Sequence, residues 1–527
     1  MFKPNQARTL AVSSPVLPTY GLDNLPVLTP VRLMGTEALG ELSEYTLDLV
    51  AVARPELPVW QAIDLVKLDG LIGREFTVEI LIEGKGIFLA GQPGNTGMGN
   101  IGATTREITG LVTQARFLGA DDRTASFQLT LRPWLHRATQ TVDSRIFQDK
   151  TVVEITDEVL APYGFPVEKR LIGRYPKRDY QRQCFESDFH FVARLWQEWR
   201  LYFWFEHSGG KHRLVLCDSP GAHPAHGPAY SEIRYHGPND TRIDEEHIHA
   251  LSVVHGLTPG AVSLVDYDYT RPRADLGVKY EDPRDTAFAR AEHYAWGDHA
   301  QPQAGATGLS GTPNQPRDEA NMLARVRMDA LRCPGLRATG KGNLRGLEVA
   351  RTFHLTHYPQ KSANREYVVV SATLDIRNPD EATVAAGSGA GYHCVTEFEI
   401  QPANAVFRSP QTLTKPTRTM ETAIVTGPEN QEIWTDALGR VKVQFPWDRQ
   451  GRRDQNSSCW MRHVSSWQGN RFGAQYVPRI GHEVLVSYVN NDPDLPIITG
   501  SAPNAFNEPS WPLPADRTDI PRRGDHD

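Results

Sequence analysis

The sequence predicts a mainly β fold with minor α content, and three observations lead to this prediction. Short runs of alternating apolar and polar residues recur along the chain, separated by Gly, Pro and Asp. Three such runs between residues 73 and 132 are echoed by three between 347 and 401. From 432 to 504 the runs are shorter and the turns closer, which is typical of a small closed antiparallel barrel. Two related β-domains followed by a barrel would explain all three; chance similarity is the alternative for the echo.

The first part of the chain is predicted to be strands. Residues 1–30 are rich in Pro and read as extended chain, and alternation begins within 29–53. The Gly-rich segment 91–104 has no strand–turn–helix context for a dinucleotide, so we interpret it as a loop. Further strands are expected at Glu75–Ile82, Arg106–Phe117 and Ala125–Arg132.

The next part has helix signals. Thr151 and Glu154 have capping-box spacing, so a helix is expected to run to about Ala161. Ser187 can cap a second helix, and a third is expected over Asp318–Leu331. Four residues after Ser187 fall on one helical face and are interpreted as core: Val192, Leu195, Trp196 and Trp199.

Strands return between and after these helices. The segment 299–316 reads as a loop, 404–418 as a polar Pro/Thr linker that marks a domain boundary, and the charged end as a frayed tail. Strands are expected at Leu201–Phe205, Arg213–Cys217, Ala250–Val254, Val262–Tyr269, Val349–His357, Tyr367–Ile376 and His393–Ile400.

Composition limits the function. The 527 residues predict roughly three or four domains. With 56 Lys and Arg against 63 Asp and Glu, the net charge of −7 argues against a nucleic-acid binder. No apolar run reaches the ~20 residues that span a bilayer, and the N-terminus has no signal-peptide core, so we expect cytoplasmic synthesis and a signal-less exit. Five scattered cysteines without CxxC are expected to be buried thiols.

No catalytic, cofactor or metal site is expected. The pairs His223/His226 and His247/His249 lack a partner at zinc-like spacing, so surface or strand histidines are the preferred interpretation. Carboxylate pairs occur at Glu245–Glu246 and Asp492–Asp494, but Asp492-Pro-Asp494 reads as a hairpin turn rather than a catalytic carboxylate pair.

An OB-type barrel can bind oligonucleotides or sugars, and 432–504 has the aromatics for it. Its basic residues are nearly matched by acidic ones, however, which argues against tracking phosphates. We therefore interpret the aromatics as barrel core or subunit interface: Trp434, Phe445, Trp447, Trp460, Trp467, Phe472 and Tyr476.

These residues resemble the VgrG family, the trimeric spike of type VI secretion, which is related to contractile-phage tail hub and tail-lysozyme spike proteins. The hub part of the resemblance rests on SRIFQDKTVVEITDEVL and RDYQRQCFESDFHFVARLWQEWRLYFWFEH. Its motif residues are Phe147, Gln148, Gln183, Glu186, Asp188, Phe189, Phe191 and Arg194. The barrel part carries Asp436, Gly439, Arg440, Phe445, Trp447, Asp448, Trp460, Arg462, Pro478, Arg479, Gly481, Glu483, Asp492, Pro493 and Gly500.

Three features depart from the family pattern. Pro446 stands where the family commonly has His, and Arg200 where a Gly usually ends the second helix, so the helix exit is expected to differ. The family continues into a triple-stranded β-helix needle, whereas this chain stops about 25 residues after its last clear strand. Either the sequence is a fragment, or it is a short spike whose needle is absent or supplied elsewhere; in both cases we expect no needle within these residues.

The resemblance implies a domain order. It comprises a first hub β-barrel (1–135), an α/β middle domain (136–245), a second hub β-barrel (246–403), a linker (404–422), a five-stranded OB-fold neck (423–512) and a tail (513–527).

It also implies a mechanical function without catalysis. Three chains would form a hub whose six barrels cap a hexameric tube of Hcp protein, with baseplate proteins as further partners. A PAAR tip protein and effectors would join where a needle is present, and the assembly would puncture a target membrane. Two rivals are a cell-wall hydrolase spike and an OB module that binds oligosaccharide or oligonucleotide.

Overall fold

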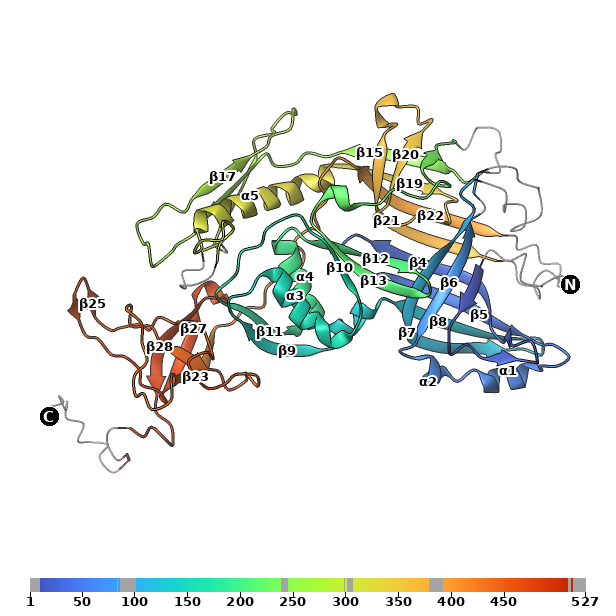
Figure 1. The fold of residues 1–527 in the computed structure, drawn as a ribbon. Helices are drawn as coiled ribbons and strands as arrows, with labels where there is room; N and C mark the ends of the chain where they lie inside the picture. Colours follow the sequence, from blue (N-terminus) through green and yellow to red (C-terminus); the bar gives the residue numbers. More distant parts are fainter. Residues whose placement is uncertain are drawn as a thin grey trace.

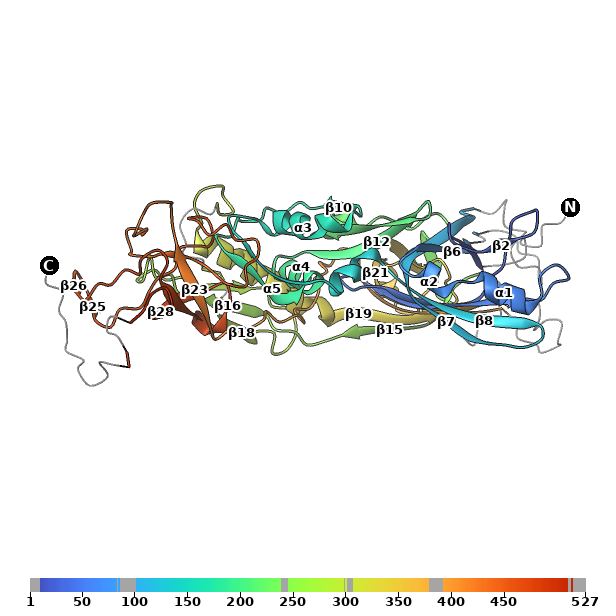
Figure 2. The same cartoon turned by 90° about the horizontal axis from the view of Figure 1, so that it is seen from below.

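The computed structural model describes residues 10–82, 84–85, 101–237, 245–297, 299–300, 307–378, 392–509 and 513–514. The molecule is elongated, with a large β-sheet at one end, helices in the middle and a small β-domain at the other end (Figures 1 and 2). Most of loop 91–104, part of loop 299–316 and most of the tail 513–527 lie outside the described residues.

One twelve-stranded sheet dominates the first end. Its strands are antiparallel, except that β14 pairs in parallel with β20. In order of pairing they are β1 (Leu10–Ser13), β6 (Glu75–Ile82), β7 (Thr104–Ala120), β8 (Thr124–Arg132), β5 (Glu44–Val52), β4 (Thr29–Ala38), β21 (Glu366–Arg377), β22 (His393–Pro402), β19 (Leu336–Gly342) and β15 (Ile248–His255), with β20 (Thr352–Thr356) and β14 (Glu232–Arg234) to the side.

The echo in the sequence corresponds to matching pairings. β6, β7 and β8 pair in succession, as do β20, β21 and β22. The two halves join where β4 pairs with β21, and Arg32 and Asp375 form an ion pair across that seam at 2.8 Å.

Among the described strands, neither half closes into a barrel of its own, which corrects the prediction of two separate closed barrels. β1 lies against β4, but both edges of β4 are occupied by β5 and β21. Hydrogen bonds that would close the first half are therefore used to join it to the second. One core spans both halves and includes Leu33, Leu47, Val369 and Ile376.

A second core holds the middle of the molecule together. Helix α3 (Val152–Leu160) has the predicted capping box at Thr151 and Glu154, and Ser187 caps α4 (Asp188–Glu198). Trp196 and Trp199 are 1% exposed, which confirms them as core residues. Around these helices lie β9 (Val142–Phe147), β10 (Val167–Arg170), β11 (Gln181–Ser187), β12 (Tyr202–Ser208) and β13 (Lys211–Cys217).

Helix α5 (Pro316–Arg332) packs on the same core with a three-stranded sheet of β17 (Val278–Glu281), β16 (Ala261–Val265) and β18 (Glu292–Trp296). Pro316 starts the helix two residues before the predicted start, because Pro suits the first helical position. β16 ends at Val265 rather than at Tyr269, since Asp268 accepts the Thr270 amide in a turn.

The small domain contains a four-stranded sheet in the order β24 (Lys442–Gln444), β23 (Met420–Thr426), β27 (Glu483–Tyr488) and β28 (Pro496–Ala502). Residues 461–463 bridge Val441 on one side and Ile498 on the other, where the predicted fifth strand would lie.

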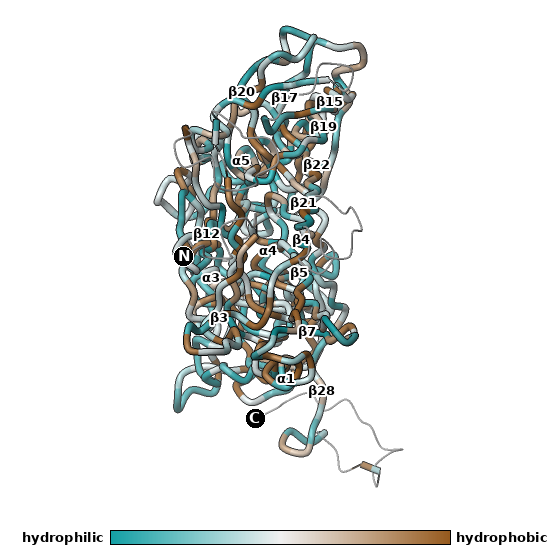
Figure 3. Tube along the Cα trace, turned by 90° about the vertical axis from the view of Figure 1, so that its right-hand side faces the viewer, coloured by the Kyte–Doolittle hydropathy of each residue, from teal (hydrophilic) through white to brown (hydrophobic). Residues whose placement is uncertain are grey.

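In Figure 3 the hydrophobic residues follow the strands and helices, and the outermost loops are mainly hydrophilic. The short elements are β2 (Thr19–Tyr20), β3 (Leu25–Pro26), α1 (Val59–Leu65), α2 (Leu68–Leu71), β25 (Gln468–Gly469) and β26 (Phe472–Gly473).

Candidate functional site

The predicted hub motif folds into a buried polar cluster beside α4. The Gln183 side chain accepts from Arg145 at 2.9 Å and donates to Asp188 at 2.8 Å. Arg194 donates to Glu186 at 2.8 Å and to the Arg182 carbonyl at 2.9 Å. Since buried charges are tolerated only when they are paired and hydrogen-bonded, these motif residues fix how β11 meets α4.

From this cluster, the Arg182 side chain crosses into the small domain. It is fully buried, and its guanidinium donates to both carboxylate oxygens of Glu421, at 2.8 and 3.0 Å. It also donates to the Tyr488 hydroxyl at 2.7 Å and lies 3.9 Å from the centre of the Trp447 ring. This bidentate, stacked geometry is specific to arginine.

A second set of ion pairs holds the linker to the same junction. Lys415 contacts Asp492 at 2.9 Å and Asp494 at 2.6 Å. Asp494 in turn accepts from the Gln181 side chain at 2.6 Å and from the Arg182 amide at 2.7 Å. The Leu495 amide donates to the Asp492 carbonyl, which confirms the predicted turn, and the structure adds that both carboxylates are used in the joint.

The third contact joins Arg440 and Arg462 of the small domain to Tyr269. Asp436 accepts from the Arg440 amide and side chain around a turn in which Gly439 has φ +71°. Arg440 also donates to the Tyr269 hydroxyl at 2.9 Å, and Arg462 lies 3.8 Å from the centre of the Tyr269 ring. We call these three sets of contacts the hub–OB joint: Arg182 with Glu421, Lys415 with Asp492 and Asp494, and Tyr269 with Arg440 and Arg462.

Charge stabilises the joint in one protonation state. Burial alone would raise the pKa of Glu421, but hydrogen bonds from Arg182 and Tyr488 lower it below its usual value. Burial lowers the pKa of Lys415, yet Asp492 and Asp494 outweigh it and raise that pKa. The carboxylate of Asp494 likewise has a lowered pKa despite its burial, because Lys415 and Arg194 stand beside it. Burial and the neighbouring Asp494 raise the pKa of Asp492, although Lys415 opposes that shift. The lowered pKa values of Glu421 and Asp494 and the raised pKa of Lys415 favour the charged forms of these three groups.

The remaining predicted motif residues lie in turns, ring contacts and surface pairs, and not all of them are part of the hub–OB joint. Phe445 stacks on Trp447 at 4.9 Å, Phe147 on Phe191 at 5.3 Å, and the Gln148 amide donates to the Asn456 carbonyl. Arg479 pairs with Glu432 on the surface, and Gly500 lies at a bulge between β27 and β28. Two of the other motif aromatics contact a second ring, Trp460 beside Trp434 and Phe189 against Phe203. Asp448 lies in a turn after β24, Pro493 lies in the turn between Asp492 and Leu495, and Gly481 has φ +92°. Pro478 is buried, and Glu483 accepts a hydrogen bond from Asn504.

Sequence reasoning missed Arg182, Glu421, Lys415 and Tyr269, although they form most of the joint. Arg182 stood inside the motif string and Lys415 was a lone cation in a polar linker, but nothing local indicated their partners.

The candidates for chemistry are used elsewhere. Glu246 is bound by Arg345 and Tyr230, and Asp492 and Asp494 belong to the joint. His223 is hydrogen-bonded to Tyr202 and to the Ala350 carbonyl. Within the described ranges, no group of three or more His, Cys, Asp or Glu could hold a metal ion, and no helix has the length and apolar content needed to cross a membrane. The cysteines are free, and all but the half-buried Cys394 are buried.

Comparisons with known proteins match this architecture part by part. The family described as phage tail baseplate hub (GPD) matches residues 36–380, and the type VI secretion system/phage-baseplate injector OB domain matches 423–502. The class of protein is therefore a baseplate hub joined to an injector-type OB domain.

More particularly, the chain belongs to the VgrG family of type VI secretion spike proteins. It is 35% identical over 515 residues to the spike protein VgrG1c of Pseudomonas aeruginosa and 34% identical over 495 residues to VgrG1a of the same organism. These alignments cover 97% and 93% of this chain and 64% and 70% of the relatives. The chain thus spans about two thirds of their length.

Solved structures show the same fold. The E. coli c3393 protein, a type VI secretion component described as similar to T4 tail proteins gp27 and gp5, superposes with a TM-score of 0.59 at 14% identity. That match covers 94% of this chain and all of the other. The lidless PdpA–VgrG complex of Francisella gives 0.56 at 7% identity, over 94% of this chain and 87% of the other.

Proposed function

We propose that this chain is a non-catalytic structural subunit of a trimeric type VI secretion spike. Three copies form the hub, cap the hexameric Hcp tube and sit among baseplate proteins. In a longer spike, a PAAR tip protein and effectors are carried at the far end. The protein is assembled in the bacterial cytoplasm and leaves without a signal peptide, into the medium or a target cell, when the machine punctures a membrane.

The hub–OB joint is the observation that carries this proposal. A spike pushed along its axis must transmit force from the wide hub into the narrow neck without shearing. Arg182, Lys415 and Tyr269 tie the two parts at three places, and two of these are buried ionic contacts. In the assembled spike the OB neck is a closed five-stranded barrel, in which 461–463 supplies the fifth side.

The seam at β4 and β21 supports the domain arrangement. Two related halves per chain, in three chains, provide six positions around the axis for a hexameric tube. The predicted boundaries at 135, 245, 403, 422 and 512 are part of this proposal.

The test is the mass in solution together with secretion. Native mass spectrometry of the full chain at micromolar concentration is expected to show three copies per particle. Deleting its gene in the source bacterium should abolish release of the tube protein, and the gene in trans should restore it. Only monomers, or release that continues without the chain, would contradict the proposal.

The hydrolase rival predicts that the purified chain solubilises peptidoglycan. Its candidate carboxylates already have basic or hydroxyl partners, so we expect no release of soluble fragments. Fragment release that is lost in Asp492→Asn would support the hydrolase instead.

A further inference from the structure

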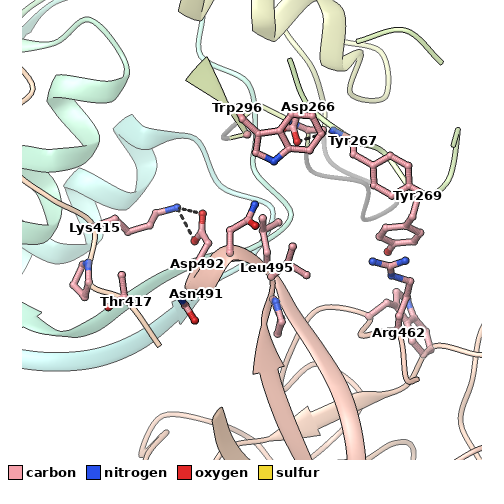
Figure 4. A pocket seen from close by; sticks show the side chains of 17 residues that line it. Asp266, Tyr267, Tyr269, Trp296, Lys415, Thr417, Arg462, Asn491, Asp492 and Leu495 are labelled. Carbon is pink, nitrogen blue, oxygen red and sulfur yellow. Dashed lines mark hydrogen bonds and ion pairs between the residues drawn. The ribbon is translucent and has the colours of Figure 1, made fainter. Parts of the chain in front are cut away.

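A cavity of about 360 Å³ opens where the OB domain meets the sheet of β16, β17 and β18. Figure 4 shows Trp296, Tyr267 and Tyr269 on one side of it, and Lys415, Asp492, Leu495 and Arg462 on the other. Trp460 and the turn at Asn490 and Asn491 complete the lining. The hub–OB joint supplies part of the wall, through Lys415, Asp492, Tyr269 and Arg462, but the proposed spike function assigns no role to the space itself. Its size falls within the range of ligand-binding clefts.

Aromatic faces form much of the lining and are exposed to solvent. Trp296 is 53% exposed and Tyr267 51%, although large aromatic side chains normally bury most of their surface. Trp296 is the last residue of β18, the edge strand of its small sheet, which holds the indole at the mouth of the cavity. The indole of Trp296 at the end of β18 and the phenol of Tyr267, two residues after β16, form an aromatic platform, and each ring offers a face on which an apolar ring face can stack.

Polar groups that lack partners stand beside this platform. Among the described residues, nothing hydrogen-bonds the Trp296 indole N–H, the Tyr267 hydroxyl, or the side-chain amides of Asn490 and Asn491. Asn490 and Asn491 have φ of +54° and +60°, two successive left-handed residues in a turn. Such a turn is uncommon outside glycine, and asparagine tolerates it. The turn therefore carries two donor–acceptor amides at one edge of the cavity.

The charges around the cavity balance. Lys415 is neutralised by Asp492, and the remaining cation, Arg462, is matched by Asp266 across the cavity. Asp266 itself accepts the amides of His299 and Ala300. A nucleotide or another anion requires excess positive charge, so this lining favours a neutral ligand.

We propose that this cavity binds a neutral oligosaccharide. Pyranose rings combine an apolar face, which stacks on Trp296 or Tyr267, with hydroxyl groups that pair with the amides of Asn490 and Asn491. OB-folds of other proteins bind oligosaccharides, which makes the position beside this domain reasonable. The site does not depend on the trimer or on secretion, so the two proposals can fail separately.

The test is a titration of intrinsic tryptophan fluorescence, with isothermal calorimetry as a second readout, on the full chain. The probes are chitotriose, maltotriose and a short oligothymidylate. We expect saturable binding of at least one sugar, about tenfold weaker binding in Trp296→Ala, and weaker binding in Asn490→Gly, which keeps the turn geometry. Trp467→Ala removes a similarly exposed indole outside the cavity and should leave binding unchanged.

Several results would overturn the site. These are no saturable sugar binding, binding that Trp296→Ala does not weaken, or saturation with oligothymidylate only. If Trp296→Ala instead dissociates an otherwise stable trimer, the cavity is a subunit contact and the sugar site is wrong, while the spike function stands.

Discussion

Arg200 shows how a single residue can keep the geometry of an element at a cost. We expected the exit of α4 to differ because Gly is replaced, but Arg200 adopts φ +78° and the Leu201 amide reaches back to the Trp196 carbonyl at 2.9 Å. This is the Schellman ending that glycine normally supports. A residue with a Cβ pays about 1 kcal/mol for that conformation.

Replacing Arg200 therefore allows a test of this strain. Arg200→Gly removes the Cβ, whereas Arg200→Ala removes the same charge but keeps the Cβ. We expect the glycine variant to be more stable than the alanine variant by about 1 kcal/mol, measured from urea unfolding midpoints. Equal midpoints would show that the left-handed residue is not strained.

At this scale, the sequence predicted burial better than partnership. The helical spacing of Trp196 and Trp199 was enough to place them in the core, because burial follows from local periodicity. Arg182 and Glu421 are 239 residues apart, and a long-range ion pair leaves no local pattern in either segment.

At the scale of elements, β12 and β13 and the loop after them carry four histidines that depend on being neutral. The His212 Nε2 accepts the Trp134 amide at 2.8 Å, and the His207 Nδ1 accepts the Thr109 amide at 3.1 Å. Burial lowers the pKa of His212 and His226 to about 3, and of His207 and His223 to about 4.

Stability should consequently fall as the pH drops below 6.5. There the unfolded chain binds protons on these imidazoles while the folded chain does not, until the pH reaches the folded pKa values near 4 and 3. Each histidine is expected to cost about 2 kcal/mol between pH 6.5 and 5. Urea unfolding across this range measures the total.

His212→Gln tests the origin of this effect, since the amide oxygen can accept the Trp134 N–H without titrating. Between pH 6.5 and 5, the unfolding free energy of this variant should fall by about 2 kcal/mol less than that of the parent, the amount expected for one histidine. His255→Gln is the control, because it replaces an exposed side chain of β15; the unfolding free energy of this variant should fall with pH as much as that of the parent. If His212→Gln loses as much stability on acidification as the parent, groups other than His212 cause the loss.

The elements themselves could largely be predicted, and their pairing could not. β6 begins and ends where alternation placed it, and the capping box gave the start of α3 to the residue. The sequence contains no signal for the pairing of β4 with β21. Alternation specifies which face of a strand is buried, but not which strand pairs along its edge.

At the scale of the whole molecule, the twelve-stranded sheet and the hub–OB joint connect the β-rich parts into a single elongated body. The seam at β4 and β21 makes the two hub halves share a core, and the joint fastens the OB domain through the linker. Arg194, one of the predicted hub motif residues, supports this arrangement by donating to the Arg182 carbonyl.

The joint should therefore be energetically coupled. Removing one partner leaves a buried charge unpaired, so Arg182→Met and Glu421→Gln are each expected to cost about 3–5 kcal/mol. The double variant should cost less than the sum, with a coupling of about 1–3 kcal/mol. Thermal unfolding measured by tryptophan fluorescence gives the stabilities, and tryptic cleavage within 404–422 reports whether the OB domain separates from the hub.

The surface pair of Arg479 and Glu432 is the matched control. Both side chains are more than half exposed, so Arg479→Met and Glu432→Gln should cost less than about 1 kcal/mol each and leave the linker protected from trypsin. If the surface pair mattered as much as the buried one, or if the Arg182 variants unfolded earlier without cleavage in the linker, the joint would not be what holds neck to hub. In the proposed spike, axial force passes through this junction. If Arg182→Met is cleaved rapidly in the linker but keeps the particle mass of the parent chain, the joint holds the OB domain to the hub without being needed for subunit assembly.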